Sequence, residues 1–298
     1  NLDSEKDCDS IVKLNADGIG LYRSETILIE DEDKIHDEEE QFYIYKKIAA
    51  DMQNLPVTIR TFDLGGDKFD TKDKEENPFL GNRGIRYSLK NPIWFKKQLR
   101  SILRASVFGN ISIMIPMVST ISEVSQTKKL IEDCKTELRR KNIEFKDVKV
   151  GIMVETPACA LALDQFAKVC DFFSIGTNDL LQYTMAVDRN NHNISELYNP
   201  YNLSFLRTLH MIITASNNFN IPLSICGELA SDTNFTILLI GFGLRELSVS
   251  MPLVKKIKKI ISSMDINQAQ LLAEKVLKLS EEEKYLEIDS FLFNKHIN

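Results

Sequence analysis

Four arginines stand where they could bind a small anion. Arg23 and Arg60 each end a short apolar run, and Arg86 and Arg189 fall in segments predicted to be loops. Guanidinium groups bind phosphate and carboxylate oxygens through paired hydrogen bonds. A lone arginine usually forms a surface salt bridge. Several arginines at one predicted binding site, in a chain of net charge −6, indicate a small ligand with several negative charges rather than a set of salt bridges.

Two carboxylates also follow apolar runs. Glu155 comes after Gly151–Val154, and Asp179 comes after Phe172–Asn178. A carboxylate at a buried strand end needs a partner, because an isolated buried charge is costly. Two carboxylates with ligand oxygens and water form an ordinary Mg²⁺ site. A glycosidase acid/base pair is a second interpretation, although it leaves the arginines unused, and pairing with arginines alone is a third.

One of the five cysteines stands at a position suited to chemistry. The odd number and the absence of a CxxC pair favour reduced thiols in a reducing compartment and exclude a zinc site of that spacing. Cys226 ends the run Pro222–Cys226 and precedes Gly227 and Glu228. A thiol with a reference pKa of about 8.5 holds its proton at neutral pH and can transfer it to carbon. A thiolate nucleophile is the alternative role.

These residues need a scaffold of alternating strands and helices. Runs that are apolar on both faces predict buried parallel strands: 18–23, 56–63, 111–118, 148–155, 172–176, 222–226 and 247–250. Helical patterns between and after them cover 38–53, 92–108, 121–141, 158–168, 203–217, 232–240, 252–263 and 266–298. In the helix predicted over 92–108, Pro92 suits the first turn and Asn91 is a plausible N-cap. One apolar stripe of this helix consists of Phe95, Leu99, Ile102 and Leu103.

The alternation predicts an α/β fold with a parallel sheet. We expect one (β/α)8 TIM barrel over residues 1–298, whose first strand ends near Asn1–Leu2 or precedes the chain. A doubly wound sheet is the rival, but no GxGxxG turn occurs. The carboxyl ends of barrel strands form the active site, so the arginines, carboxylates and Cys226 are predicted to converge there.

Loops and bulk composition add further expectations. In Leu64–Lys68 (LGGDK), Lys68 can present a positive charge to an anion, and the long loop from Leu64 to Arg86, which includes the polar stretch 69–76, is a candidate lid. The acidic segment 30–40 is interpreted as a solvated loop that enters a helix rich in first-turn carboxylates. No apolar run reaches the roughly 18 residues of a membrane span, and the acidic balance argues against a nucleic-acid partner.

Six segments in order resemble successive motifs of the Enzyme I family of the bacterial phosphotransferase system. They cover nearly the whole chain: GIGLYRSE, RTFDLGGDK, ENPFLGNRGIR, GIMVETPA, FFSIGTNDLLQYTMAVDRNN and ICGELASD. Pyruvate phosphate dikinase and phosphoenolpyruvate synthase share the GTND and CGE segments but differ from the LGGDK and AVDR pattern. The resemblance therefore favours Enzyme I over these relatives.

The resemblance implies a barrel of the phosphoenolpyruvate/pyruvate-binding type that binds phosphoenolpyruvate with Mg²⁺. The phosphoryl group would pass to a histidine on a separate N-terminal domain, absent from this sequence, and then to the histidine phosphocarrier protein that serves sugar uptake. It further implies a cytoplasmic homodimer. By motif, the expected roles are substrate binding by Arg23, Arg60, Arg86, Arg189, Lys68, Asn178 and Asp179, Mg²⁺ binding by Glu155 and Asp179, and proton donation by Cys226.

Three positions depart from the family pattern near these motifs. Leu181 replaces the usual threonine, Met185 a leucine and Ser231 a glycine. They put substrate affinity rather than reaction type in question. Two other functions stay open at this point: a dimerising module that senses phosphoenolpyruvate without turnover, and a Mg²⁺-dependent lyase that acts on a pyruvate enolate without needing Cys226.

Overall fold

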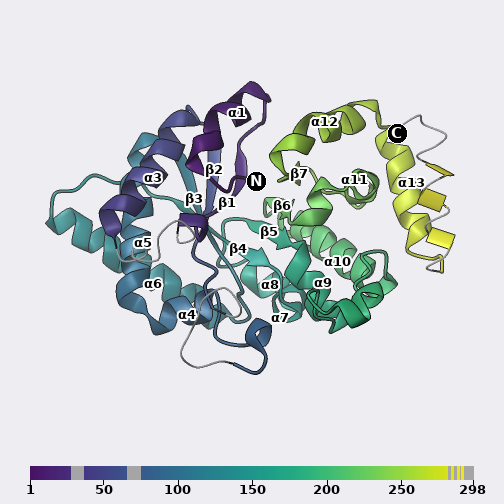
Figure 1. Cartoon of the computed structure of the whole chain (residues 1–298), viewed down its shortest axis with the longest axis horizontal. Coiled ribbons are helices and arrows are strands. Elements are labelled where there is room, and N and C mark those ends of the chain that lie inside the picture. Colours follow the sequence, from purple (N-terminus) through teal and green to yellow (C-terminus); the bar gives the residue numbers. More distant parts are fainter. Residues whose placement is uncertain (28–36, 66–74, 281–282, 285–286, 289, 292–298) are drawn as a thin grey trace. The chain divides into compact units, whose positions relative to one another are not determined.

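A computed structural model describes residues 1–27, 37–65, 75–280, 283–284, 287–288 and 290–291. Within these residues, seven strands follow one another in sheet order from β1 to β7, and every strand pairing described is parallel (Figure 1). The fold class is α/β of the TIM-barrel type, as expected. The strands are β1 (Ile19–Arg23), β2 (Pro56–Arg60), β3 (Asn110–Ile115), β4 (Lys149–Val154), β5 (Phe173–Gly176), β6 (Leu223–Cys226) and β7 (Glu246–Leu247).

An isolated bridge stands where the first barrel strand was expected to end. Leu2 pairs in parallel with Tyr22 of β1. The Leu2 amide donates to the Leu21 carbonyl at 2.9 Å, and the Leu2 carbonyl accepts from the Arg23 amide at 3.1 Å. Leu2 is itself buried. The chain start therefore extends the ladder of β1 by a single bridge rather than by a strand.

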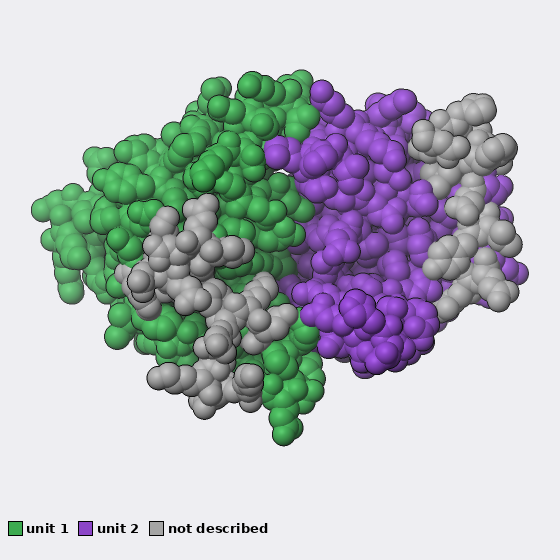
Figure 2. Space-filling view, viewed as in Figure 1, with its two compact units in different colours: residues 1–153, 169–172 green, residues 154–168, 173–298 purple. Residues whose placement is uncertain are grey.

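The chain divides into two compact units, shown in green and purple in Figure 2. Unit 1 holds residues 1–153 and 169–172, and unit 2 holds residues 154–168 and 173–298. Unit 1 contains β1, β2, β3 and nearly all of β4, whereas unit 2 contains β5, β6 and β7. Of the candidate residues, the arginines up to Arg86 belong to unit 1, and the carboxylates, Asn178, Arg189 and Cys226 belong to unit 2.

Unit 1 packs its helices against the strands through apolar stripes. The helices that matter here are α3 (Glu38–Asp51), α4 (Ile85–Lys90), α5 (Pro92–Ala105) and α6 (Ile121–Arg140), and α5 packs against both α3 and α6 (Figure 1). The predicted α5 stripe is confirmed, since Phe95, Leu99, Ile102 and Leu103 are all buried. Asn91 stands at the predicted N-cap position of α5, but its side chain makes no capping hydrogen bond there. Its amide donates to the Tyr87 carbonyl at 2.9 Å, because α4 ends at that point and uses this side chain.

Unit 2 follows the predicted order of helices, except that one predicted helix is divided in two and α9 (Thr177–Met185) was not predicted. Its helices are α7 (Pro157–Leu161), α8 (Leu163–Phe166), α9 (Thr177–Met185), α10 (Leu203–Phe219), α11 (Thr233–Gly241), α12 (Val254–Ser263) and α13 (Ile266–Val276). The single helix predicted over 158–168 is two short helices, since Ala162 leaves helical geometry with φ −109° and ψ 25°. The last strand occupies Glu246–Leu247, where 247–250 was expected. No helix in the described ranges has the length and apolar character needed to cross a bilayer.

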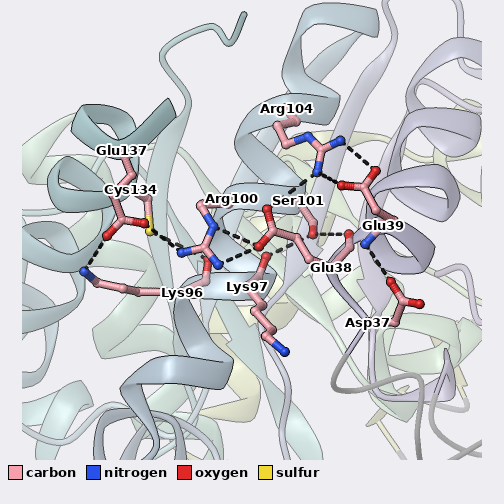
Figure 3. Close-up of polar contacts among 10 residues, drawn as sticks. All are labelled: Asp37, Glu38, Glu39, Lys96, Lys97, Arg100, Ser101, Arg104, Cys134 and Glu137. Atoms are coloured by element: carbon pink, nitrogen blue, oxygen red, sulfur yellow. Dashed lines mark hydrogen bonds and ion pairs between the residues drawn. The ribbon is translucent and has the colours of Figure 1, made fainter. Parts of the chain in front are cut away.

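The acidic segment enters α3 through an ordinary cap, and its first-turn carboxylates form ion pairs (Figure 3). Asp37 Oδ1 accepts from the Glu39 amide at 2.8 Å. Glu38 accepts from Arg100 of α5 at 2.9 Å, and Glu39 pairs with Arg104 at 2.6 Å. The expected first-turn carboxylates are thus confirmed, but they also bind α3 to α5. Residues 28–36 of the acidic segment lie outside the described residues.

Glu137 of α6 completes this network by accepting from Lys96 at 2.9 Å and from Arg100 at 2.8 Å (Figure 3). The hydrogen bond from Lys96 is the main cause that lowers the pKa of Glu137 below its ordinary 4.5. A carboxyl with a lowered pKa stabilises the fold above its ordinary value and loses that contribution as pH falls through the lowered one. Low pH should therefore weaken the contact of α6 with α5.

The melting temperature of Glu137→Gln is expected to lie below that of the wild type at neutral pH. The gap should close as pH falls below 4.5, because the wild-type carboxyl becomes neutral there. Thermal melts followed by circular dichroism over about pH 3–7 measure this gap. Glu274→Gln, an exposed position on α13, serves as the control. A gap that stays constant across the range would contradict the role given to Glu137.

Candidate functional site

In unit 1, a buried network of charges surrounds Arg60 at the end of β2. Arg60 Nη2 pairs with Glu25 Oε1, and Arg60 Nη1 lies 3.5 Å from Asp63 Oδ2 and 3.7 Å from Met153 Sδ. Asp63 accepts in turn from Arg83, at 3.3 Å from Nε and at 2.8 Å from Nη2. Two arginines thus balance two carboxylates, and each of the four side chains is at most 8% exposed. Charge balance is what makes such burial tolerable.

A second set of contacts fixes the backbone at the end of β2. Ser24 Oγ donates to the Arg60 carbonyl at 2.6 Å. The Gln98 amide nitrogen donates to Ser24 Oγ at 3.0 Å, while its oxygen accepts from the Phe62 amide at 3.1 Å. All of these side chains are buried. The position of the Arg60 guanidinium is therefore set from both its backbone and its ion pairs.

The other predicted cations of unit 1 have different surroundings. Arg23 lies opposite Arg60 in the β1–β2 register and pairs with Asp3 at 2.8 Å, and its side chain is 33% exposed. Arg86 donates to the carbonyls of Leu80 and Gly81 at 3.0 and 3.1 Å and to Ser119 Oγ at 3.3 Å. Arg86, which was predicted to lie in a loop, is in the first turn of α4, and its contacts tie this helix to the segment that precedes it. Lys68 lies outside the described residues, as does most of the polar stretch 69–76 in the proposed lid.

In unit 2, the register of two neighbouring strands places Cys226 beside the GTND segment. Cys226, the last residue of β6, pairs with Gly176, the last residue of β5. The Cys226 thiol donates to the Ile175 carbonyl at 3.4 Å, and Thr177 Oγ1 donates to the Cys226 carbonyl at 2.9 Å. Gly227 follows with φ +88°, and a Cβ there would lie 2.3 Å from Thr177 Oγ1. A glycine is required for this close approach.

The Asn178 side chain is held in one orientation by its neighbour on the next loop. Its Nδ2 donates to Glu228 Oε1 at 3.2 Å, and its Oδ1 accepts from the Glu228 amide at 3.1 Å. The hydroxyl of Tyr198 donates to the Asn178 main-chain carbonyl at 3.0 Å. Burial raises the pKa of Tyr198 to about 12, so this hydroxyl keeps its proton at neutral pH. The remaining Nδ2 hydrogen of Asn178 is the group available to a ligand.

Two buried carboxylates of unit 2 offer oxygen ligands for a cation. Glu155 directly follows β4 and is 1% exposed, and Asp179 lies in the first turn of α9 and is 6% exposed. Arg189 Nη1 lies 3.5 Å from Asp179 Oδ1. The described residues contain no group of three or more His, Cys, Asp or Glu side chains able to hold a metal. Two carboxylates fit Mg²⁺, which keeps several waters and takes further oxygens from a phosphorylated ligand.

The remaining cysteines have the structural surroundings that were expected. All five thiols are buried and none forms a disulfide. Burial raises the pKa of Cys134 and of Cys170 to about 12, so neither is a thiolate at neutral pH. Of the histidines in the described residues, His192 and His210 are exposed.

The structure adds partners that the sequence reasoning had given no role. They are Glu25, Asp63 and Arg83 around Arg60, and Glu228 and Tyr198 around Asn178. Four of the five fall inside the motifs that carried the family resemblance, which was the signal that could have found them. Tyr198 lies outside every motif, and only its contact with Asn178 reveals it.

Comparison with known proteins assigns the family of this chain. The chain belongs to the family described as the PEP-binding domain of PEP-utilising enzymes. The model of this family matches residues 1–266. Curated relatives are phosphoenolpyruvate-protein phosphotransferases. That of Mycoplasma capricolum is 43% identical over 99% of this chain and 52% of its own length. The enzyme of Listeria monocytogenes is 42% identical over 97% of this chain and 51% of its own length. The enzyme of Haemophilus influenzae is 43% identical over 100% of this chain and 52% of its own length.

The chain spans about half the length of the curated relatives it matches. Solved structures with a similar fold include a citrate lyase from Burkholderia xenovorans, with a TM-score of 0.50, 14% identity, and coverage of 88% of this chain and 80% of that one. An HpcH/Hpal aldolase/citrate lyase family protein from Burkholderia cenocepacia matches with a TM-score of 0.50 and 12% identity over 87% and 89%. At this identity the likeness concerns the fold alone.

Proposed function

We propose that this chain is the phosphoenolpyruvate-binding catalytic part of a phosphoenolpyruvate-protein phosphotransferase. It would transfer the phosphoryl group of phosphoenolpyruvate to a histidine on a separate domain and release pyruvate. The relatives' shared name supports this assignment. The observation that carries it is the β5–β6 register, which brings the Cys226 thiol next to the segment that holds Asn178 and Asp179.

The residues of unit 2 would bind the phosphate end of the ligand. Asn178 would donate its remaining amide hydrogen, and Arg189 would add a guanidinium. Glu155 and Asp179 would hold Mg²⁺, which neutralises charge on the phosphoryl and enolate oxygens when bound. In unit 1, Arg23, Arg60 and Lys68 would bind carboxylate or phosphate oxygens of the ligand. The convergence of both groups on one ligand stays a prediction from the sequence.

The guanidinium of Arg86 in α4 already donates to three acceptors, which are the carbonyls of Leu80 and Gly81 and the hydroxyl of Ser119. A bound ligand would have to displace one of these contacts or accept from a guanidinium N–H that none of them uses. These contacts favour a role in holding the segment before α4 over a direct role in substrate binding. Arg86→Lys would separate the two roles, since lysine keeps the charge but lacks the fork.

The proton chemistry belongs to Cys226. When the bond between the enol oxygen and phosphorus breaks, the phosphoryl group leaves with the histidine nitrogen, and the electron pair stays on pyruvate as an enolate. The methylene carbon of the enolate then takes the proton of the Cys226 thiol, which gives pyruvate and a thiolate. Water returns a proton to sulfur. Burial of Cys226 at 2% exposure keeps solvent from competing with the thiol for the carbanion.

The relatives' name also supports the wider assignment. The phosphorylated domain would pass its phosphoryl group to the histidine phosphocarrier protein for sugar uptake, in the cytoplasm, and the barrel would act as a homodimer. A domain that binds phosphoenolpyruvate without turnover is the main alternative. Retention of Cys226 beside GTND argues against it, because a sensing module has no need of a proton donor to carbon.

The proposal is tested by adding a separately produced phosphohistidine domain, phosphoenolpyruvate and Mg²⁺ to this chain. We expect phosphohistidine and pyruvate to form in equal amounts, and chelation of the metal to stop both. Pyruvate is measured by coupled lactate dehydrogenase and phosphohistidine by radiolabel. Tight binding of phosphoenolpyruvate without either product would contradict the proposal and favour the sensing module.

Asp179→Asn is expected to abolish most of the Mg²⁺-dependent binding of phosphoenolpyruvate, because an amide is a poorer cation ligand than a carboxylate. The rate of pyruvate formation should fall on the order of 10²–10³-fold, which is typical of losing one electrostatic contact. Titration of Mg²⁺ at fixed phosphoenolpyruvate measures the first effect. Asp164→Asn, an exposed position on α8, is the matched control. An unchanged Mg²⁺ titration in Asp179→Asn would remove Asp179 from the metal site.

A further inference from the structure

We propose that Gln98 of α5 is a positioning residue that orients the guanidinium of Arg60 for the ligand. This inference rests on the proposed function and concerns a residue that lies outside all six family motifs. Gln98 is 0% exposed, although its side chain is polar. A buried amide is tolerated where hydrogen bonds replace its contacts with water. The partners of this amide therefore show what the side chain does.

The hydrogen bonds of Gln98 have only one possible direction. The Phe62 amide can only donate, so the atom that accepts from it at 3.1 Å must be the Gln98 oxygen. The Gln98 nitrogen then faces the other way and donates to Ser24 Oγ and to the Tyr45 hydroxyl, both at 3.0 Å. A rotated amide would place two donors face to face at Phe62. One side chain of α5 thus connects the segment after β1, the segment after β2 and helix α3.

Ser24 carries this constraint to Arg60. It directly follows Arg23, the last residue of β1, and it is 0% exposed. Because Gln98 donates to the hydroxyl oxygen, the hydroxyl directs its single proton toward the Arg60 carbonyl at 2.6 Å. The pairing of β1 with β2 ends at Arg23 and Arg60. The Ser24 side chain therefore continues the contact between the two strand ends by one residue.

The same segment also holds the side chain of Arg60. Glu25, the residue after Ser24, pairs with Nη2 of Arg60. Two consecutive residues thus hold Arg60 at its carbonyl and at its guanidinium, and Gln98 ties them to Phe62 on the far side of Arg60. A guanidinium binds an oxyanion through two parallel bonds only when its plane has the right orientation. Loss of the Gln98 amide would let residues 24 and 25 shift and turn the Arg60 guanidinium with them.

Ser24→Ala and Ser101→Ala form a matched pair that tests this role. Both serines are 0% exposed, and each hydroxyl donates to a main-chain carbonyl. Ser101 donates to the Glu38 carbonyl at 2.8 Å, so it joins α5 to the start of α3 instead of to a strand end (Figure 3). Both variants should lower the melting temperature. We expect the dissociation constant of phosphoenolpyruvate with Mg²⁺ to rise about ten-fold in Ser24→Ala, which corresponds to about 1.4 kcal/mol, and less than about two-fold in Ser101→Ala.

Gln98→Met tests the residue itself, because methionine has nearly the same length but no amide. Calorimetry should show the same ten-fold rise in the dissociation constant as in Ser24→Ala. The double variant should lose little more affinity than either single variant, since both changes break one path to Arg60. Additive losses would overturn the inference. If Gln98→Met is too unstable to titrate, the comparison of Ser24→Ala with Ser101→Ala decides the matter.

The outcomes separate this inference from the proposed function. A wild-type chain that does not bind phosphoenolpyruvate would overturn the proposed function and this inference with it. If the wild type binds and either Ser24→Ala or Gln98→Met binds equally well, the inference fails and the proposed function stands. An equal loss of affinity in Ser101→Ala would also overturn it, because loosening of α5 alone would then explain the weaker binding.

Discussion

Cys226→Ala is expected to abolish pyruvate formation, with a loss of at least about 10³-fold, while phosphoenolpyruvate still binds with nearly wild-type affinity. Proton transfer by a positioned side chain contributes typically about 10²–10⁴-fold to a rate. Alanine removes the only hydrogen that the thiol could give to the enolate carbon. It leaves untouched the Asn178, Asp179 and Arg189 groups proposed to bind the phosphate. Coupled pyruvate detection and calorimetry measure the two effects.

The control for this variant is a second buried cysteine. Cys134→Ala changes a fully buried thiol of α6, whose Sγ donates to the Lys96 carbonyl at 3.7 Å. It should reduce stability slightly and leave the rate of pyruvate formation unchanged. Turnover of Cys226→Ala at the wild-type rate would show that another group protonates carbon. A lyase-type reaction on the same barrel, which has no need of the thiol, would then become the better interpretation.

Arg60→Ala is expected to have two large effects, on binding and on stability. Sequence reasoning alone predicts a loss of activity with the fold intact. The structure alters the second half of that prediction, because Arg60 is buried between Glu25 and Asp63. Removing one partner of a buried ion pair typically costs about 3–5 kcal/mol. Thermal melts should therefore show a marked loss of stability, and calorimetry a loss of phosphoenolpyruvate binding of at least about 10²-fold.

Arg60→Lys separates the two effects. Lysine keeps a positive charge between the carboxylates, so most of the stability should return. It lacks the planar fork that binds phosphate or carboxylate through two parallel bonds, so phosphoenolpyruvate affinity should stay low. An Arg60→Ala variant that melts and binds like the wild type would contradict both the buried network and the substrate role. Recovery of full affinity in Arg60→Lys would reduce the role of Arg60 to its charge.

The fold was predictable because its strands are apolar on both faces. That pattern predicted the order of the strands and most of the helices between them, but not α4 or α9. Strand ends were less well predicted: residues 61–63 were assigned to the second strand, but β2 stops at Arg60. The amide of Thr61 still donates to the Met114 carbonyl at 2.9 Å, so one hydrogen bond to β3 continues beyond the end of β2. The predicted strand extends a few residues further than the observed one. The break at Ala162 has no marker in the sequence.

The site was predictable only in part, for a related reason. Strand order alone places Cys226 next to Gly176, so the thiol and the GTND segment could be brought together from sequence. The family motifs contain Glu25, Asp63 and Arg83 but do not show that they surround Arg60, because the paths of these loops depend on tertiary packing. Tyr198 reaches Asn178 only through the turn that follows Ala186. A pattern of apolar residues contains no information about that turn.

The most direct test of the account is a calorimetric titration of this chain with phosphoenolpyruvate, performed with and without Mg²⁺. The account predicts binding that requires the metal and that is lost both in Asp179→Asn and in Arg60→Lys. Loss in both variants would show that the carboxylates of one unit and the arginine of the other act on the same ligand. Binding of phosphoenolpyruvate that is equally tight without Mg²⁺, or that survives both substitutions, would contradict the account.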